Sequence, residues 1–296
     1  MIQEIHRLKK EKDAVILAHN YQIPPVQDLA DFVGDSLELS RTAAKIDCTM
    51  VLFCGVDFMA ETAAILSPRK DVVLPEPSAR CPMAQMVTAD QVREARELYP
   101  EASVVCYVNS TAEVKAESDI CCTSANAISV VSSLPNRQVL MVPDENLARY
   151  VARHVDKEVI PWNGYCYVHD RFRPDDVLKA RRLHPQAELL VHPECRPEVI
   201  DLADGVFSTS GMARHAKASR TSEFIIGTEN GMLHRLKKEM PQKEFYPLST
   251  DAICQNMKKT TVDKLLNSLR TGQPKVEVPE AIAVRARRAI EKMLAI

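Results

Sequence analysis

The sequence predicts an α/β protein built from three copies of one helix-and-strand unit, each with a parallel sheet. Residues 88–109 and 173–194 align without gaps and share the pattern Val-x-x-Ala-Arg-x-Leu-x-Pro-x-Ala, followed by an apolar strand. Three cysteines, Cys81, Cys166 and Cys254, recur at intervals of 85 and 88 residues. Self-similarity at a regular period indicates structural repeats. Alternating helices and strands predict parallel sheets with right-handed crossovers.

Each unit begins with a helix that leads into a buried strand. Residues 2–21 form a shorter relative of the two aligned segments. The helices carry apolar residues every three or four positions, as at Val92, Ala95 and Leu98. The strands are continuous apolar runs, which are typical of parallel strands covered on both faces. We expect them at Val15–Ala18, Val104–Cys106 and Leu189–Val191.

A second helix and two further strands are expected in each unit. In the first unit, one helix over Leu29–Ala44 should lead to a strand at Met50–Cys54. The matching second strands are Asp119–Thr123 and Gly205–Thr209, and the third strands are Val72–Leu74, Val139–Val142 and Glu223–Ile226. An additional extended segment precedes the cysteine at Glu158–Pro161 and Glu244–Pro247. Because the first unit lacks one, the repeat is expected to be imperfect there.

The repeats divide the chain into three expected domains and a C-terminal extension. The expected domains are residues 1–86, 87–172 and 173–261. Two helices, Val262–Arg270 and Pro279–Leu294, follow, and residues 262–296 are expected to pack back onto the first domain. Ligands of parallel α/β sheets bind beyond the carboxyl ends of the strands. We therefore expect the strand ends of the three units to face one common centre.

Composition and charge exclude several classes of protein. The net charge of −2 predicts no binding to nucleic acid, and no apolar run reaches the ~20 residues of a membrane span. Neither a Gly-x-Gly-x-x-Gly motif nor a P-loop occurs. The charged N-terminus lacks an apolar signal region, so we expect a cytoplasmic protein whose nine cysteines stay reduced.

The nine cysteines separate into two groups. Most lie in or beside apolar strands and are expected to be small core side chains. This group comprises Cys48, Cys54, Cys106, Cys121 and Cys122. Cys195, next to Glu194, is ambiguous, but it has no counterpart in the other units and is therefore not favoured as a ligand. Cys81, Cys166 and Cys254 instead lie in loops. Their spacing alone leaves two alternatives open: three thiolates that bind a metal cluster with one open metal position, or three buried thiols.

Polar side chains follow the expected strands at equivalent positions. His19, Tyr107 and His192 come directly after the first strand of each unit, and Tyr21, Asn109 and Glu194 stand two residues later. Hydroxyls at Ser36, Ser124 and Thr209 stand near helix starts, where free N–H groups bind anions. A single such histidine is commonly structural, and a single hydroxyl is commonly a helix cap. Their recurrence in three repeats favours a shared site.

Longer motifs carry a family resemblance. They include LAHNYQ (17–22), YVNSTAEVKA (107–116) and GMLHRLKKEMPQKEFYP (231–247), and similar segments span the whole chain. The sequence resembles the quinolinate synthases, the type A, iron–sulfur-dependent enzymes of bacterial and archaeal NAD biosynthesis. The resemblance implies three three-layer αβα domains arranged as a triangle around a central cavity. It also implies a 4Fe–4S cluster bound by Cys81, Cys166 and Cys254, with one open iron.

The resemblance further implies a reaction and a set of site residues. A transferase of this family condenses iminoaspartate with dihydroxyacetone phosphate to quinolinate, phosphate and water, and functional coupling to an iminoaspartate-producing enzyme is expected. The open iron would act as a Lewis acid. The implied substrate-binding residues are His19, Ser36, Tyr107, Asn109, Ser124, His192, Glu194 and Thr209, and the catalytic residues are Tyr21, Glu194, Tyr107 and His19. Glu194 is the expected general base.

Three alternatives remain open at this stage. A different 4Fe–4S hydro-lyase acting on a hydroxy acid would use the same three cysteines and open iron. A non-enzymatic iron–sulfur sensor would need the cysteines but not the polar residues at the strand ends. A mononuclear zinc site of three cysteines would contain no sulfide.

Overall fold

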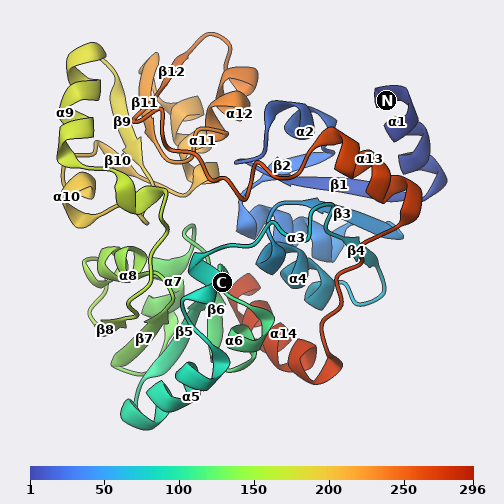
Figure 1. The fold of residues 1–296 in the computed structure, drawn as a ribbon. Coiled ribbons are helices and arrows are strands. Elements are labelled where there is room, and N and C mark those ends of the chain that lie inside the picture. The colour runs from blue at the N-terminus through green and yellow to red at the C-terminus, as the bar shows by residue number, and fades with distance from the viewer.

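A computed structural model describes all 296 residues as three parallel α/β sandwiches arranged in a triangle (Figure 1). Each sandwich contains one four-stranded sheet with helices against it. The strand orders are β2-β1-β3-β4, β6-β5-β7-β8 and β10-β9-β11-β12, and every pairing is parallel. The predicted fold class, three three-layer αβα units with parallel sheets around a centre, is therefore confirmed.

The first repeat contains four helices and four strands that alternate along the chain, beginning with a helix. Its elements are α1 (Ile2–Glu11), β1 (Ala14–His19), α2 (Pro24–Leu29), β2 (Phe32–Gly34), α3 (Ser36–Lys45), β3 (Met50–Cys54), α4 (Asp57–Leu66) and β4 (Asp71–Val73). Strands β1 and β3 form the centre of the sheet and are almost entirely buried. This explains their unbroken apolar sequences.

The second and third repeats have the same order. The second contains α5 (Ala89–Leu98), β5 (Ser103–Tyr107), α6 (Ala112–Ala116), β6 (Ile120–Cys122), α7 (Ala127–Ser133), β7 (Gln138–Val142), α8 (Glu145–Ala152) and β8 (Glu158–Pro161). The third contains α9 (Pro174–Leu183), β9 (Glu188–Val191), α10 (Pro197–Ile200), β10 (Gly205–Val206), α11 (Thr209–Ala218), β11 (Glu223–Gly227), α12 (Met232–Glu239) and β12 (Glu244–Pro247).

The helix predicted over Leu29–Ala44 is wrong, because an edge strand interrupts it. Ala30 leaves the helical conformation, Phe32–Gly34 pairs with β1, and Asp35 then caps a new helix through the N–H groups of Leu37 and Glu38. The edge strand is too short for a visible apolar period. Consequently β3 corresponds to β7 and β11, and β4 corresponds to β8 and β12. The first repeat is complete, contrary to the expectation from the sequence.

Two recurring polar contacts support this register. An aspartate precedes the edge strand in each repeat and accepts a hydrogen bond from a backbone N–H of the neighbouring central strand. The pairs are Asp31 with Ile16 at 2.8 Å, Asp119 with Val104 at 2.7 Å and Asp204 with Leu189 at 2.7 Å. A lysine before the fourth strand donates to carbonyls near or just after the end of the helix that precedes the third strand, which is α3, α7 or α11. These lysines are Lys70, Lys157 and Lys243.

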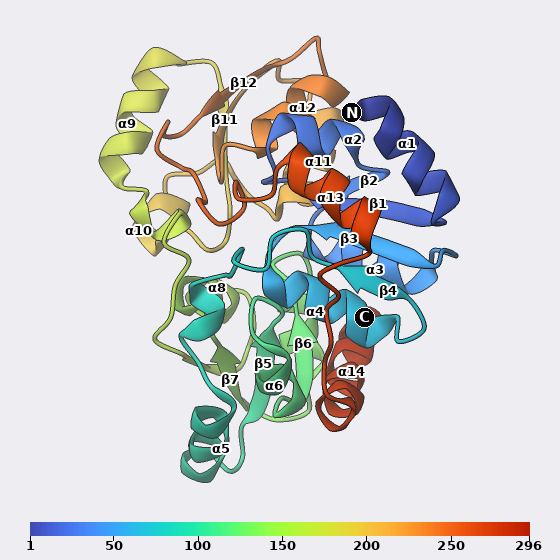
Figure 2. The same cartoon turned by 45° about the vertical axis from the view of Figure 1, so that its right-hand side comes forward.

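The two C-terminal helices pack in different places. Helix α13 (Val262–Thr271) contacts α1 and β3 of the first repeat, as expected. Helix α14 (Glu280–Leu294) crosses to the second repeat, where it lies mainly against α6 and β6 and also touches α4 (Figure 2). Helix α14 thus departs from the expectation that both helices pack back onto the first repeat, because it touches that repeat at α4 but lies mainly on the second. An apolar stripe does not specify which neighbouring surface it covers. No helix of the chain combines the length and apolar character needed to span a membrane.

Candidate active site

The carboxyl ends of the three sheets enclose a central cavity. All twelve side chains predicted from the sequence line it, although they come from nine different loops and strand ends. They are His19, Tyr21, Ser36, Cys81, Tyr107, Asn109, Ser124, Cys166, His192, Glu194, Thr209 and Cys254. Parallel strands direct all their carboxyl ends to one edge of a sheet. Three such edges that face one another therefore bring distant segments together.

Two buried histidines occupy equivalent positions after β1 and β9. The Nδ1 atom of His19 accepts a hydrogen bond from the N–H of Tyr21 at 3.1 Å, and that of His192 accepts one from the N–H of Glu194 at 3.3 Å. Burial lowers the pKa of both His19 and His192 to about 3. Both rings are therefore neutral at pH 7, with the proton on Nε2. The Nε2 of His192 lies 3.2 Å from the Ser124 hydroxyl, to which it can donate.

Glu194 lies at the centre of the polar network. Its side chain is buried, and its Oε1 accepts a hydrogen bond from the Tyr107 hydroxyl at 2.5 Å. Burial alone would favour the neutral acid, but the hydrogen bonds from His169 and the Tyr107 hydroxyl oppose it, and the pKa of Glu194 is lowered. Glu194 is thus a buried carboxylate with hydrogen-bond donors on both sides. Such a group can accept a proton from a ligand in the cavity.

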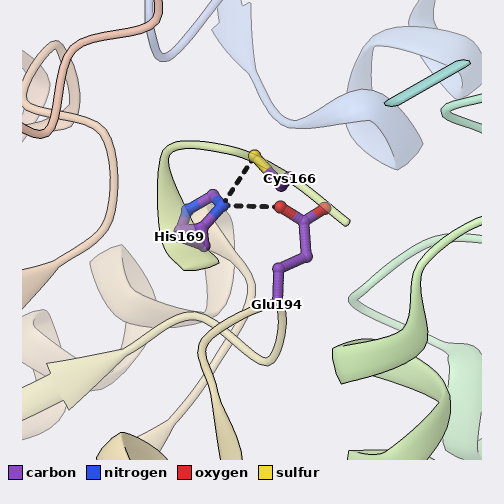
Figure 3. A group of neighbouring side chains, drawn as sticks. All are labelled: Cys166, His169 and Glu194. Atoms are coloured by element: carbon purple, nitrogen blue, oxygen red, sulfur yellow. Dashed lines mark hydrogen bonds and ion pairs between the residues drawn. The ribbon is translucent and has the colours of Figure 1, made fainter. Parts of the chain in front are cut away.

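His169 was not predicted from the sequence, although it contacts two predicted residues. Its Nδ1 lies 2.6 Å from Oε2 of Glu194 and 3.2 Å from Sγ of Cys166 (Figure 3). A 3₁₀ turn over His169–Arg171 directs the ring inward. Cys166 and His169 have the Cys-x-x-His spacing of metal ligands, which is a signal that could have identified His169.

Thr228, also missed, extends the network from His169 to Tyr21. Its Oγ1 lies 2.8 Å from Nε2 of His169 and 2.6 Å from the Tyr21 hydroxyl. Burial and the nearby Glu194 raise the pKa of Tyr21 and of Tyr107 well above the usual value, so both hydroxyls remain protonated. An unbroken chain of hydrogen-bonding groups therefore connects Tyr21 with Glu194.

Several groups in the cavity are suited to anions. Ser36 and Thr209 are the first residues of α3 and α11, where the helix dipole favours negative charge, although Asp35 and Ser208 already cap some of the first-turn N–H groups. Asn20 donates to the Thr209 hydroxyl at 2.7 Å and thereby orients it. The Oδ1 atom of Asn109 is buried without a hydrogen-bond partner. Because unpaired buried polar atoms are rare, this atom indicates a place for a ligand.

The nine cysteines divide spatially as their sequence context predicts. Six are buried in the cores of the repeats, and Cys195 in particular packs with the third repeat and lies outside the cavity lining. Cys81, Cys166 and Cys254 reach the cavity from three loops, and no disulfide is formed. Burial raises the pKa of all three thiols, so the loss of their protons must be coupled to binding of a cation.

The donor atoms fit an iron–sulfur group. Three thiols converge from three repeats, and thiolates are the protein ligands of iron–sulfur clusters. A second arrangement is a single ion held by Cys166, His169 and Glu194, whose ligand atoms lie within 4.8 Å of one another. That set uses only one of the three cavity thiols and leaves Cys81 and Cys254 unexplained.

Comparisons with known proteins agree with this geometry. The family model described as quinolinate synthetase A protein matches residues 3–295. A quinolinate synthase of Methanoregula boonei is 63% identical over 294 residues, which cover 99% of this chain and 97% of the relative. Relatives of the same name from Thermodesulfovibrio yellowstonii (54% identical; 99% and 97% covered) and Dehalococcoides mccartyi (57%; 98% and 96%) are also similar. The chain belongs to the quinolinate synthetase A family, enzymes of NAD biosynthesis that require an iron–sulfur cluster.

Proposed function

We propose that the central cavity condenses iminoaspartate with dihydroxyacetone phosphate to form quinolinate, phosphate and water. The observation that carries the proposal is the convergence of three thiols, a buried carboxylate and several anion donors in one cavity. We further propose that Cys81, Cys166 and Cys254 hold a 4Fe–4S cluster. With three protein ligands, the fourth iron would supply a Lewis acid that polarises a carbonyl or hydroxyl oxygen.

Both substrates are anions, and the cavity offers donors for them without a lysine or arginine in its lining. Ser124, Asn109, His192 and Thr209 are proposed to bind the carboxylates or the phosphate. The neutral His192 can donate from Nε2, and Thr209 adds the N-terminus of α11. Ser36 and His19 are proposed to orient the triose-derived part. Neutral donors of this kind bind an anion without stabilising the charge so strongly that the product is retained.

The protonation states suggest roles in proton transfer. Glu194 is a carboxylate and is proposed to remove protons during enamine formation and ring closure. Tyr21 is a protonated hydroxyl and is proposed to deliver a proton during dehydration. Tyr107 positions the Glu194 carboxylate through the 2.5 Å hydrogen bond to Oε1.

We also propose the chain's organisation and setting. The domain limits 1–86, 87–172 and 173–261 are proposed because each range contains one complete four-stranded sheet. A cytoplasmic location suits nine unpaired cysteines. Iminoaspartate is an imine that water hydrolyses, so functional coupling to the enzyme that produces it is proposed.

The experiment is anaerobic turnover with both substrates, comparing the wild type with Glu194→Gln. We expect quinolinate from the wild type. In the variant, turnover should fall by about 100-fold or more, since that is the usual contribution of an acid–base group. The visible spectrum of the cluster should be unchanged. Unchanged turnover would remove Glu194 from this role.

The same preparation separates the alternatives. Dehydration of a hydroxy acid without quinolinate formation would identify a hydro-lyase. A reversible redox change without turnover of either kind would identify a sensor. Zinc without acid-labile sulfide would identify a mononuclear site.

A further inference from the structure

Two hydrogen bonds recur at each cysteine of the cavity, one between backbone groups and one from the cysteine N–H to a side-chain carboxylate. The first is between backbone groups. The carbonyl two residues before the cysteine accepts a hydrogen bond from an N–H that follows the third strand of the same repeat. These contacts join Ala79 to Asp57 at 2.9 Å, Gly164 to Glu145 at 2.7 Å and Ala252 to Asn230 at 2.9 Å. The three cysteine loops are therefore fixed to their sheets at equivalent points.

A carboxylate completes each attachment in the opposite direction. The backbone N–H of each cysteine donates to a carboxylate that stands two or three residues after the third strand. The pairs are Cys81 with Asp57 at 3.1 Å, Cys166 with Asp144 at 3.1 Å and Cys254 with Glu229 at 3.0 Å. Asp144 and Glu229 are among the most deeply buried charged residues of the chain. Burying such groups is costly unless they have partners, so their recurrence requires a reason.

We propose that Asp57, Asp144 and Glu229 are positioning residues that fix the three cysteine backbones so that their thiols converge on the proposed cluster. This inference rests on the proposed function. Groups outside the ligand shell that orient metal ligands commonly contribute 10- to 100-fold to metal affinity. The contact here is to the main chain beside the thiol. It therefore fixes the direction of the Cα–Cβ bond without competing for the sulfur.

Asp57 and Asp144 differ in a way that allows a sharp test. In Asp57 a single oxygen, Oδ1, accepts from the N–H of both Phe58 and Cys81. In Asp144 the two oxygens have separate partners, since Oδ1 caps α8 at the N–H of Leu147 and Oδ2 accepts from Cys166. Asparagine keeps one acceptor oxygen and replaces the other with a donor. Asp57→Asn can therefore preserve both hydrogen bonds of Oδ1, whereas Asp144→Asn can preserve only one of its two contacts, either the helix cap or the cysteine contact. Asp144→Ser separates these two contacts, because serine also caps a helix but is too short to reach Cys166.

The experiment measures iron and acid-labile sulfide per chain in anaerobically purified enzyme, and then the rate at which a chelator removes the iron. Four variants are compared with the wild type: D57A, D57N, D144A and D144S. We expect iron release to be about 10- to 100-fold faster in D57A, D144A and D144S. The rate of iron release from D57N should remain within about twofold of the wild-type rate. Asparagine lacks the negative charge but keeps the acceptor oxygen, so this rescue could not arise from a charge effect.

Several outcomes would overturn the proposal. Equal acceleration in D57N and D144S would assign the effect to lost charge, and no acceleration in D144S would make the contact dispensable. Thermal unfolding of each variant, followed by circular dichroism, monitors the fold. If D144S does not fold, the comparison of D57A with D57N provides the test, since only D57N retains the acceptor of the Cys81 N–H. A wild type without iron and sulfide would refute the proposed cluster itself.

Discussion

The first and second repeats share one apolar core, whereas the third repeat has cores of its own. A single cluster of 49 buried residues runs from the first repeat through the second and includes the apolar face of α14. The apolar clusters of the third repeat contain buried residues of that repeat and, from the loop that precedes it, only Val168 and Phe172. The third repeat therefore shares much less apolar interior with the other two than they share with each other.

Polar contacts connect the third repeat to the first. Asn20 donates to Thr209 at 2.7 Å and accepts from Arg235 at 2.9 Å, and Ser208 donates to Asp35 at 3.2 Å. Hydrogen bonds are directional and can be exchanged for water at small net cost, unlike apolar contacts. The first two repeats therefore form a stable base, and the third delivers its site residues to the cavity through hydrogen bonds. We expect the third repeat to separate from the base more readily than the base divides.

The greatest loss of stability is expected from a substitution in the apolar core of the base. Ile290 of α14 is fully buried in the shared cluster. Replacing it with alanine should reduce the free energy of unfolding by about 2–5 kcal/mol, through lost burial and the remaining cavity. Denaturant unfolding measures the change. Arg288→Ala, on the exposed face of the same helix, should change it by less than about 0.5 kcal/mol. Equal effects would mean that α14 is not an essential part of the base.

A smaller, pH-dependent effect is expected where the repeats meet. The folded pKa of His192 is about 3, below the unfolded value near 6.5, so the folded state binds fewer protons between these pH values. The stabilisation is fully present above pH 6.5 and is lost as the pH falls. At pH 5 the loss from His192 is about 2 kcal/mol relative to pH 7.

Thermal unfolding at several pH values measures this dependence. His19 belongs to the first repeat, has the same lowered pKa and should contribute equally. The variant His192→Gln cannot be protonated, so its stability should fall less steeply between pH 7 and pH 5 than that of the wild type. Identical slopes would show that His192 is protonated inside the folded protein.

The polar contacts of the third repeat should give the weakest response. Asn20→Ala removes the partner of Thr209 and one partner of Arg235, which keeps its ion pair with Glu239, so the cost should be about 1 kcal/mol. Hydrogen exchange should increase in the third repeat and remain unchanged in β5 and β7. A control is Asp28→Asn, which weakens exposed ion pairs to His234 and Lys238 and should cost less than about 1 kcal/mol. Faster hydrogen exchange in β5 and β7 of the Asn20→Ala variant would contradict the claim that the third repeat can separate from the base while the base stays intact.

Sequence patterns predicted the fold where apolar runs were long and failed where structure depends on partners. The central strands β1, β5 and β9 were identified because burial on both faces requires continuous apolar residues. The edge strand Phe32–Gly34 was missed because it is short and half exposed. The position of α14 could not be derived, since an apolar stripe does not specify which of two surfaces it covers.

The site was predicted where residues recur at strand ends and was incomplete elsewhere. All twelve predicted side chains line one cavity, but His169 and Thr228 have no counterpart in the other repeats. The carboxylates Asp57, Asp144 and Glu229 do recur, at intervals of 87 and 85 residues, close to those of the cysteines. Their regularity was concealed because the incorrect helix over Leu29–Ala44 shifted the register of the first repeat.

The proposed cluster and its ligands are tested by the iron and sulfide content of single cysteine variants, purified anaerobically. We predict about four iron and four sulfide per chain in the wild type, as a 4Fe–4S cluster requires. Cys81→Ser, Cys166→Ser and Cys254→Ser should each lose the visible absorbance of the cluster, and Cys195→Ser should retain it. A cluster that survives loss of one of the three cavity thiols, or one that requires Cys195, would contradict the proposed ligand set.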